Sequence, residues 1–535
     1  MMKPSDSSTA ADTSSKLQQE ISEASVLLRE GRLAEASNLG RTLVQAYPKE
    51  SRAYAFAAEA SNLDGNLPQA LSWIDKAIEF SDDPQHKIKK AWLLSRALRR
   101  DEIPALAAQA SAQAGRDARL FWQIGKLYYH HNMLPEAIAQ FERALTAAGK
   151  NAAWSYDLGL ARFYSGDMNR AEIDLNNVLA AAPQAGAVLY LRSTLRRQTP
   201  ESNHVAELER HLSVGFRKDE DQAGALYALA KELEDLGEHE KSFAALSAGA
   251  SKKRGTIKYD ISSFRTTMDE IRDVQHAKAL AMPVACCEEE GAIFIVGMPR
   301  TGTTLAQRIL LQSGKVKDAG ELLDFGFHLT AAVQKVCAAN PGLSPAMATL
   351  AVDFSALGET YMRGARQMAG GSPSFIDKLP VNYLYCGLIH KALPKARILH
   401  MVRDPLDTCY AIFKTLFFNA YDFSYDLEEL AEYYVGYRRM MQHWHEEIPG
   451  VILDVRYEDL VTNTEAEARR IYDWCGLEWN AEALNVPDRD KVFATASAAQ
   501  VREPVHARSV NSSRKHVDEL ARLSGILAAA GILGP

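Results

Sequence analysis

The sequence contains no long apolar run and no spaced pair of cysteines. Nowhere do about 18 apolar residues follow one another, which argues against a membrane-spanning helix. The six cysteines include no C-x-x-C pair, and only Cys286 and Cys287 are adjacent. This pattern argues against a zinc ribbon or a disulfide framework, and it favours reduced thiols and a cytoplasmic location. Residues 1–15 are polar and lack the apolar segment of a signal peptide, so we expect a disordered tail there.

Neither charge sign is strongly in excess. The chain carries 61 Lys and Arg against 68 Asp and Glu, a formal net charge of -7 at pH 7. This balance gives no general attraction to nucleic acid or to an anionic membrane. The apolar fraction of 47% is ordinary for a globular protein, and 535 residues suggest about two to four domains. Any anion must therefore be bound at a local site.

The N-terminal half contains a repeat with a period of 34 residues. The positions with this spacing are Gly31 and Gly65, Gly125 and Gly159, and Ala137 and Ala171. Period and residue types resemble tetratricopeptide repeats, in which small residues let paired helices approach closely. The resemblance implies an α-solenoid, predicted over residues 16–255, with a concave face formed by stacked helix pairs. A helical bundle with coincidental spacing is the alternative.

The texture of the sequence changes near residue 285. Short β-rich segments then alternate with helical stretches, which indicates an α/β domain with a central parallel sheet. We expect a connecting helix and linker over residues 256–290 and the second domain over residues 291–535.

A glycine-rich loop follows the first β-rich segment of this domain. The segment 292–296 leads into Gly297-x-x-x-x-Gly302, and a helical stretch begins after it. Backbone N–H groups of such a loop, with the helix dipole, form a cradle for an anion. A nucleoside triphosphatase has a lysine where this chain has Thr303, and here the cation in the loop is Arg300. A strand–helix turn without a ligand is the alternative.

The loop resembles that of sulfotransferases that use 3′-phosphoadenosine 5′-phosphosulfate (PAPS), whose donor loop reads P-R-S/T-G-T-T. The resemblance covers roughly residues 293–515 and is strongest to tyrosylprotein sulfotransferases and to bacterial relatives with repeats. It implies a P-loop-like three-layer α/β sulfotransferase domain with PAPS as cosubstrate and no metal. It also implies phosphosulfate contacts from the loop residues Arg300, Thr301, Gly302, Thr303 and Thr304.

Three further segments carry the catalytic residues that the resemblance implies. Glu321, in a Gly-Glu-Leu segment, corresponds to the catalytic base, and Lys378 to the lysine that stabilises the transferring sulfuryl group. Ser497 lies in a late loop that closes over the donor in the family. The structural alternatives are a glutamate favouring a helix N-terminus and a solvated lysine.

Other segments match the part of the family's site that binds the nucleotide. Arg403 ends the β-rich segment 398–402 and corresponds to the arginine that grips the donor's 3′-phosphate; an arginine at the carboxyl end of a parallel strand suits this role. A salt bridge to Asp404 or Asp407 is the alternative. Tyr457 corresponds to an adenosine contact, or is an ordinary core tyrosine. The remaining residues assigned to the donor are Gln500, Val501, Pro504, Arg514 and Lys515.

The sequence departs from the family at two places. Ala411 stands where the family has a serine that contacts the 3′-phosphate, which removes one hydrogen bond worth about 1 kcal/mol. Thr408 is a candidate replacement. The basic–aromatic pair late in the family is also absent, so Arg514 or Lys515 is expected to reach the 3′-phosphate instead.

Two other functions remain as alternatives. One is a P-loop kinase or triphosphatase, which the missing lysine disfavours. The other is a repeat-based adaptor whose second domain binds donor weakly or not at all, which Ala411 favours. For a sulfotransferase, the repeats suggest a protein or peptide acceptor, including a tyrosine hydroxyl, since such concave faces hold extended chains. The repeats also suit oligomerisation, including a homodimer, or recruitment of a partner.

Two conspicuous clusters are interpreted as structural. The aromatic residues between positions 413 and 425 have helical spacing, which favours a core role over an acceptor cleft. His443 and His445 are two positions apart and do not share a helical face, so a solvated helix is expected there instead of a metal site.

Overall fold

The computed structural model describes residues 7–417, 420–484 and 507–533. By packing, the chain forms two compact units, Met1–Leu158 and Gly159–Pro535. No helix in the described ranges is long and apolar enough to cross a membrane. The boundary near residue 285 is predicted from a change in residue types along the sequence. The division by packing instead falls inside a helix of the repeats, so it does not test that boundary, which stays a prediction.

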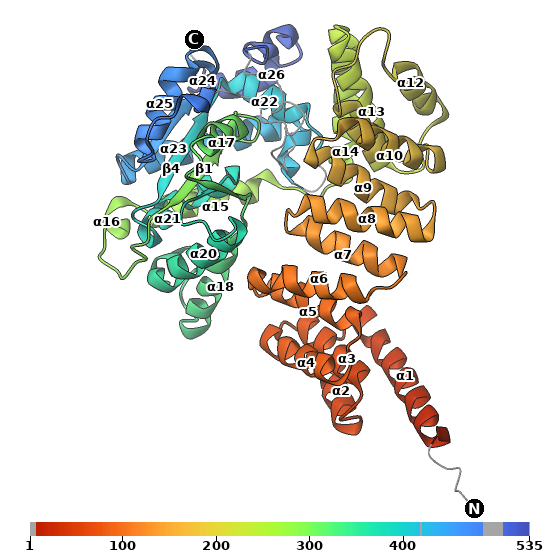
Figure 1. Ribbon diagram of the computed structural model, residues 1–535. Coiled ribbons are helices and arrows are strands. Elements are labelled where there is room, and N and C mark those ends of the chain that lie inside the picture. The colour runs from red at the N-terminus through yellow and green to blue at the C-terminus, as the bar shows by residue number, and fades with distance from the viewer. Residues whose placement is uncertain (1–6, 418–419, 485–506, 534–535) are drawn as a thin grey trace, which may run out of the picture. The chain divides into compact units, whose positions relative to one another are not determined.

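The first unit consists of helices that pack as successive antiparallel neighbours, drawn in red to orange in Figure 1. They are α1 (Ser7–Arg29), α2 (Leu33–Ala46), α3 (Ser51–Leu63), α4 (Leu67–Phe80), α5 (Pro84–Arg96), η1 (Arg100–Glu102), α6 (Ile103–Gln113), α7 (Ala118–His130) and α8 (Leu134–Ala148). The helix α1 includes residues that the sequence assigned to the tail. A helical repeat region is confirmed.

Small residues allow the close helix contacts that the repeat pattern predicts. A Cβ atom on Gly40 of α2 would lie 2.9 Å from the Cα atom of Ala57 in α3. A Cβ atom on Gly125 of α7 would lie 2.6 Å from the ring of Phe141 in α8. Both distances are far below van der Waals contact, so Gly40 and Gly125 set the separation of their helix pairs, and of these two only Gly125 recurs at the 34-residue spacing.

The second unit begins within α9 (Ala152–Ser165) and contains more helices of the repeat type. These are α10 (Met168–Ala181), α11 (Gly186–Thr194), α12 (Val205–Val214), α13 (Asp219–Asp235) and α14 (His239–Gly255), followed by α15 (Ile261–Val274) and α16 (Ala277–Leu280). Gly186 and Gly224 lie against each other where α11 meets α13, and a Cβ atom on Gly224 would be 2.4 Å from the carbonyl carbon of Gly186.

A five-stranded parallel sheet follows, in the order β2-β3-β1-β4-β5. Its strands are β1 (Ala292–Gly297), β2 (Lys317–Gly320), β3 (Phe375–Asp377), β4 (Arg397–Val402) and β5 (Ile452–Arg456). The strand β1 is buried along its whole length, as expected for a central strand covered on both faces. The α/β domain with a central parallel sheet is therefore confirmed.

Helices cover both faces of the sheet, so the domain has three layers. On one face, Ile295 and Leu399 share a core with Ile309 of α17 (Thr303–Leu311) and Ile471 of α25 (Thr464–Trp474). On the other, Phe294 stacks on Tyr361 of α20 (Phe354–Met368), with ring centroids 5.4 Å apart. The remaining elements are α18 (Asp324–Ala339), α19 (Pro345–Ala348), η2 (Thr349–Ala351), η3 (Pro380–Tyr385), α21 (Cys386–Ala392), α22 (Pro405–Phe413), η4 (Asp422–Tyr425), α23 (Leu427–Glu447), α24 (Tyr457–Thr462), η5 (Ala481–Leu484), η7 (Ser512–His516) and α26 (Ala521–Ala529).

Candidate active site

Each strand of the sheet ends at a residue or loop that the sequence singled out. The glycine-rich loop follows β1, and the residues directly after the other strands, in chain order, are Glu321, Lys378, Arg403 and Tyr457. Because all strands are parallel, these residues lie along one edge of the sheet. Parallel sheets bind ligands at this carboxyl edge, which makes it the candidate active site.

Strand register pairs these residues two by two. Gly320 of β2 lies opposite Asp377 of β3, so the residues that follow, Glu321 and Lys378, come side by side. Their side chains form an ion pair between Lys378 Nζ and Glu321 Oε1. The lysine side chain is 2% exposed and the glutamate side chain 38% exposed. Lys378 is therefore not the solvated lysine of the alternative interpretation, and its ammonium is directed at a carboxylate that solvent can reach.

Strand register also brings Arg403 close to Tyr457. Val402 of β4 lies opposite Arg456 of β5, and the guanidinium carbon of Arg403 sits 4.9 Å from the centre of the Tyr457 ring. Such a cation–π contact orients both groups. A Cβ atom on Gly302, in the loop after β1, would lie 2.6 Å from Tyr457 Cδ2. Tyr457 thus packs directly on the glycine-rich loop and is 9% exposed; its role as an adenosine contact stays a prediction.

The loop depends on backbone conformations that favour glycine. Gly302 has φ +96° and Gly297 has φ +144°, and a Cβ atom on Gly297 would lie 2.7 Å from the carbonyl oxygen of Met401. Arg300 adopts φ 68°, in the left-handed region that non-glycine residues rarely occupy. No side chain caps the first turn of α17. The N–H groups at that end remain available to an anion.

The loop threonines support the backbone instead of presenting their side chains to solvent. Thr301 Oγ1 donates a hydrogen bond to the carbonyl oxygen of Met298, at 2.7 Å, and Thr301 is 1% exposed. Thr303 and Thr304 are also buried. We therefore expect donor contacts from this loop to come mainly from main-chain N–H groups.

Arg403 ties the loop to the C-terminal segment. It donates from Nη1 to the carbonyl oxygen of Arg300, at 2.9 Å, and from Nη2 to that of Ser509, at 2.6 Å. The Asp407 carboxylate is more distant, 3.9 Å from Nη2, so a salt bridge is not its main interaction. Arg403 is 6% exposed, and its Nε has no hydrogen-bond partner in the described ranges. A buried donor without a partner is costly, so this N–H group is available to a ligand that reaches it.

Neighbouring threonine hydroxyls do not replace the serine that is absent at Ala411. Thr408 Oγ1 donates to the carbonyl oxygen of Asp404, at 2.8 Å, and Thr408 is fully buried. Thr415 Oγ1 donates to the carbonyl oxygen of Ala411 itself, also at 2.8 Å. A hydroxyl has one hydrogen to donate and phosphate oxygens only accept, so neither threonine has a donor left.

Asp407 anchors the described part of the C-terminal segment. From the sequence, it is only a candidate salt-bridge partner of Arg403. The Asp407 carboxylate accepts from Asn511 N at 2.6 Å and from Ser513 N at 2.8 Å. Arg514 and Lys515, next in the chain, are exposed. The predicted residues Ser497, Gln500, Val501 and Pro504 lie outside the described residues.

Asp377 is a further residue whose role the sequence did not reveal. It is fully buried and accepts from Tyr361 Oη at 2.8 Å, from Leu322 N at 3.2 Å and from Asn382 Nδ2 at 3.1 Å. Burial raises the pKa of this carboxyl group to about 7. Leu322 follows Glu321 and Asp377 precedes Lys378, so this carboxyl group fixes the backbone on both sides of the ion pair. The only sequence signal was its place in the Asp-Lys motif.

The aromatic residues between 413 and 425 are largely buried, with Phe413, Phe423 and Tyr425 each at most 3% exposed. Tyr421 is half-buried, and its ring centre lies 4.8 Å from that of Phe417. Burial, and then the nearby charge of Glu321, raise the pKa of the Tyr421 hydroxyl. Among the described rings, Tyr421 therefore lies near the ion pair, while Phe413, Phe417, Phe423 and Tyr425 belong to the core; Phe418 lies outside the described residues.

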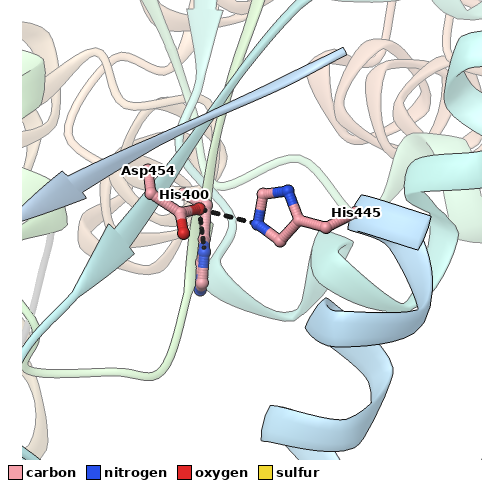
Figure 2. A group of neighbouring side chains, drawn as sticks. All are labelled: His400, His445 and Asp454. Carbon is pink, nitrogen blue, oxygen red and sulfur yellow. Dashed lines mark hydrogen bonds and ion pairs between the residues drawn. The ribbon is translucent and has the colours of Figure 1, made fainter. Parts of the chain in front are cut away.

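His443 and His445 differ from the solvated helix that the sequence predicts. His443 is 8% exposed, and its Nε2 is 3.0 Å from the carbonyl oxygen of Gln275. Figure 2 shows His445 and His400, from α23 and β4, pointing at one oxygen of Asp454 in β5, at 3.0 and 2.8 Å. Tertiary contacts, invisible to helical spacing, bury His443 and His400, while the side chain of His445 stays 39% exposed. His400, His445 and Asp454 together have the ligand atoms to hold a cation. The hydrogen bonds from the two histidines to Asp454 already explain how the three side chains lie.

Residues 292–481 match the model of the Sulfotransferase family. A Caenorhabditis briggsae protein named "Putative protein-tyrosine sulfotransferase" is 24% identical over 258 residues, which are 46% of this chain and 89% of that protein. An uncharacterised Aquifex aeolicus protein is 26% identical over 376 residues, 68% of this chain. The chain spans 48% of the length of that Aquifex protein.

Solved structures of two kinds are similar to part of this chain. The sulfotransferase domain of the Synechococcus PCC 7002 olefin synthase matches 47% of this chain and 98% of its own, at 16% identity and a TM-score of 0.33. The C-terminal part of a TPR repeat-containing protein from Cytophaga hutchinsonii matches 43% of this chain and 94% of its own, at 16% identity and a TM-score of 0.35.

Proposed function

We propose that residues 291–535 transfer a sulfuryl group from PAPS to an acceptor hydroxyl, with Glu321 as the general base. The observation that carries the proposal is the carboxyl edge of the sheet, where strand register sets Glu321 against Lys378 and Arg403 against Tyr457. The match of residues 292–481 to the Sulfotransferase family supports it. A triphosphatase is disfavoured, because Thr303 replaces the loop lysine and is buried.

The residues fit the chemistry of this transfer. A bond forms between the acceptor oxygen and sulfur while the bond from sulfur to the phosphate oxygen breaks, and adenosine 3′,5′-bisphosphate leaves. Glu321 accepts the acceptor's proton, a step that typically contributes about 10²- to 10⁴-fold. Lys378 and the N–H groups of the loop offset negative charge on the sulfuryl and leaving-group oxygens. The mechanism requires no metal.

An aromatic acceptor, such as a tyrosyl side chain of a protein or peptide, is the substrate class that we favour. A phenol has a pKa of about 10, so a base must remove its proton for it to react at neutral pH. Tyr421 places an aromatic ring near Glu321, where it would pack beside such an acceptor. The similarity to the Caenorhabditis briggsae protein points to the same class. The helical repeats would hold the extended chain around the acceptor residue.

Ligand binding tests the donor assignment directly. Adenosine 3′,5′-bisphosphate should raise the melting temperature of the full-length protein, because it binds only the folded state. ATP with Mg²⁺ should not. Stabilisation by ATP and Mg²⁺ alone would favour a triphosphatase, and stabilisation by neither nucleotide would favour an adaptor. Transfer of labelled sulfate from PAPS to a tyrosine-containing peptide then tests the acceptor class.

A further inference from the structure

A cavity lies beside the proposed donor site, between the last repeat helices and the α/β domain. Its volume is about 490 Å³, within the range of small-ligand pockets. The helices α11 and α13 and the segment after α11 line one side, including Arg196, Arg197 and Lys231. Lys414, directly after α22, and Lys515 in η7 line the other side.

Packing within the second unit fixes the two walls of this cavity against each other. Tyr227 Oη of α13 donates to the carbonyl oxygen of Phe413, at 3.1 Å, and is buried. Tyr190 Oη of α11 accepts from Leu416 N, also at 3.1 Å. Phe243 of α14 stacks over the α/β domain's Tyr410, with centroids 6.5 Å apart. The repeat residues therefore form a fixed wall of the cavity.

The cavity adjoins Arg403, the residue assigned to the 3′-phosphate. Arg403 donates to the carbonyl oxygens of Arg300 and Ser509. The side chains of Arg300 and Arg508, the latter next to Ser509, line the cavity. Arg403 also carries the buried Nε without a hydrogen-bond partner in the described ranges. Tyr410, next to Ala411 in the chain, also lines the cavity, so the position of the absent serine lies close to it.

Positive charge in the cavity exceeds what its own carboxylates neutralise. Glu234 pairs with Lys414, with Nζ–Oε distances of 2.8 and 3.1 Å, and Asp235 pairs with Lys231 at 2.7 Å. These are the two carboxylates of the lining. Lys231 Nζ also donates to the carbonyl oxygen of Arg196, which leaves one of its three N–H groups for an anion. Arg197 and Lys515 have no hydrogen-bond or ion-pair partner in the part of the chain that the structure describes. Several cations around one hollow attract an anion and disfavour an empty site.

We propose that the repeat helices complete the donor site: Arg197 and Lys231, together with Lys515, bind the 3′-phosphate of the donor nucleotide in place of the serine absent at Ala411. The inference rests on the proposed function, which supplies the nucleotide. Its phosphosulfate end lies at the loop after β1, and its second phosphate extends past Arg300 into the cavity. The repeats then take part in donor binding in addition to any contact with the acceptor.

Titration calorimetry of the full-length protein with two nucleotides tests this assignment. Adenosine 3′,5′-bisphosphate and adenosine 5′-monophosphate differ only in the 3′-phosphate. Arg197→Gln and Lys231→Gln should each weaken bisphosphate binding by about 10-fold, as expected for loss of a charge-assisted hydrogen bond. Both variants should leave monophosphate binding unchanged. Lys252→Gln is the control, because Lys252 lies on α14 outside the cavity and pairs with Asp219.

The outcomes separate this inference from the proposed function. Wild-type protein that binds neither nucleotide would refute the proposed function and the inference with it. Wild-type protein that prefers the bisphosphate, with both variants keeping that preference, would refute only the inference. An unchanged preference with a raised KM for an acidic peptide acceptor would assign the cavity to the acceptor instead. An equal loss of affinity for both nucleotides would indicate that the substitution distorts the site. Arg197 is exposed and has no partner among the described residues, so its replacement should not distort the fold, and an equal loss in Arg197→Gln would refute the proposal.

Discussion

Glu321 and Lys378 differ in exposure, so removing either one has a different consequence. In Glu321→Gln we expect kcat to fall by about 10²- to 10⁴-fold through loss of the base. The same change leaves the buried Lys378 ammonium without its carboxylate, and the melting temperature should fall. In Lys378→Met, kcat should fall while the melting temperature changes little, because the carboxylate left behind is partly solvated.

Steady-state kinetics with a peptide acceptor and thermal melts of both variants provide the measurement. Glu465→Gln serves as the control, because this carboxylate on α25 is 56% exposed and pairs with Arg469 at the surface. Full turnover in Glu321→Gln would remove Glu321 from the role of base.

Asp377 should make stability depend on pH in the direction opposite to that of most carboxylates. Burial raises its pKa from 3.8 to about 7, so between these values the folded state holds a proton that the unfolded state has released. Stability from this group is complete below about pH 4 and decreases as pH rises to about 7. The slope reaches at most about 1.4 kcal/mol per pH unit.

Urea unfolding of wild-type protein and Asp377→Asn across pH 4 to 8 isolates this slope. The difference in unfolding free energy between the two proteins should shrink as pH rises. The variant also loses hydrogen bonds to Tyr361 and Asn382, which shifts its stability at every pH but does not produce the slope. Parallel curves for the two proteins would show that Asp377 is ionised in the folded state throughout.

At the scale of elements, the turn from β1 to α17 depends on the absence of a side chain at Gly302. An alanine there meets the Tyr457 ring at 2.6 Å and must also adopt φ +96°. We expect Gly302→Ala to abolish measurable binding of adenosine 3′,5′-bisphosphate while the protein remains folded. Gly314→Ala separates the two causes, because Gly314 has φ +68° with open space around its Cβ position.

Calorimetry measures nucleotide binding by the two glycine variants, and thermal melts measure their stability. Gly314→Ala should lower stability by about 1 kcal/mol through backbone strain and leave nucleotide binding intact. Equal loss of binding in the two variants would mean that the contact with Tyr457 does not shape the loop.

The sequence predicts which residues lie at the end of each strand, but not which of them pair with one another. The β-rich segments and the residues that follow them predict a parallel sheet whose carboxyl edge gathers Glu321, Lys378, Arg403 and Tyr457, and the structure has this arrangement. The pairing of these residues follows from strand register, which a single sequence does not display. Likewise, the acceptor of the Thr408 hydroxyl depends on how its helix begins, so sequence alone left it as a replacement for the missing serine.

At the scale of the whole molecule, the change in sequence texture and the packing of the chain do not coincide. Texture separates repeats from α/β domain near residue 285, while packing joins α10–α14 to that domain. Glu234 of α13 accepts from Tyr410 at 3.2 Å and from Lys414 at 2.8 Å, and Arg254, in the last turn of α14, pairs with Glu429 of α23 at 2.7 Å. Residue types predicted both kinds of domain, but contacts between distant segments leave no periodic signal.

Two truncated chains test which division is the physical one. Residues 152–535 retain all of the second unit, and we expect a cooperative unfolding transition and full affinity for adenosine 3′,5′-bisphosphate. Residues 291–535 lose α10–α16. Loss of α10–α14 exposes Tyr410 and Phe413 and removes the carboxylate that pairs with Lys414, and loss of α15 and α16 removes their packing on α23. Losing a few kcal/mol from a domain of this size should lower its melting temperature by roughly 5–10 °C.

Size-exclusion chromatography, thermal melts and nucleotide titration of the two fragments beside the full-length chain give the comparison. The shorter fragment should aggregate or melt early, and any folded fraction should discriminate poorly between adenosine 3′,5′-bisphosphate and the monophosphate. A 291–535 fragment as stable and as selective as the 152–535 fragment would show that α10–α14 contribute neither packing nor charge to the donor site. The boundary near residue 285 would then be the physical one, because the α/β domain would fold and bind its nucleotide without the repeats.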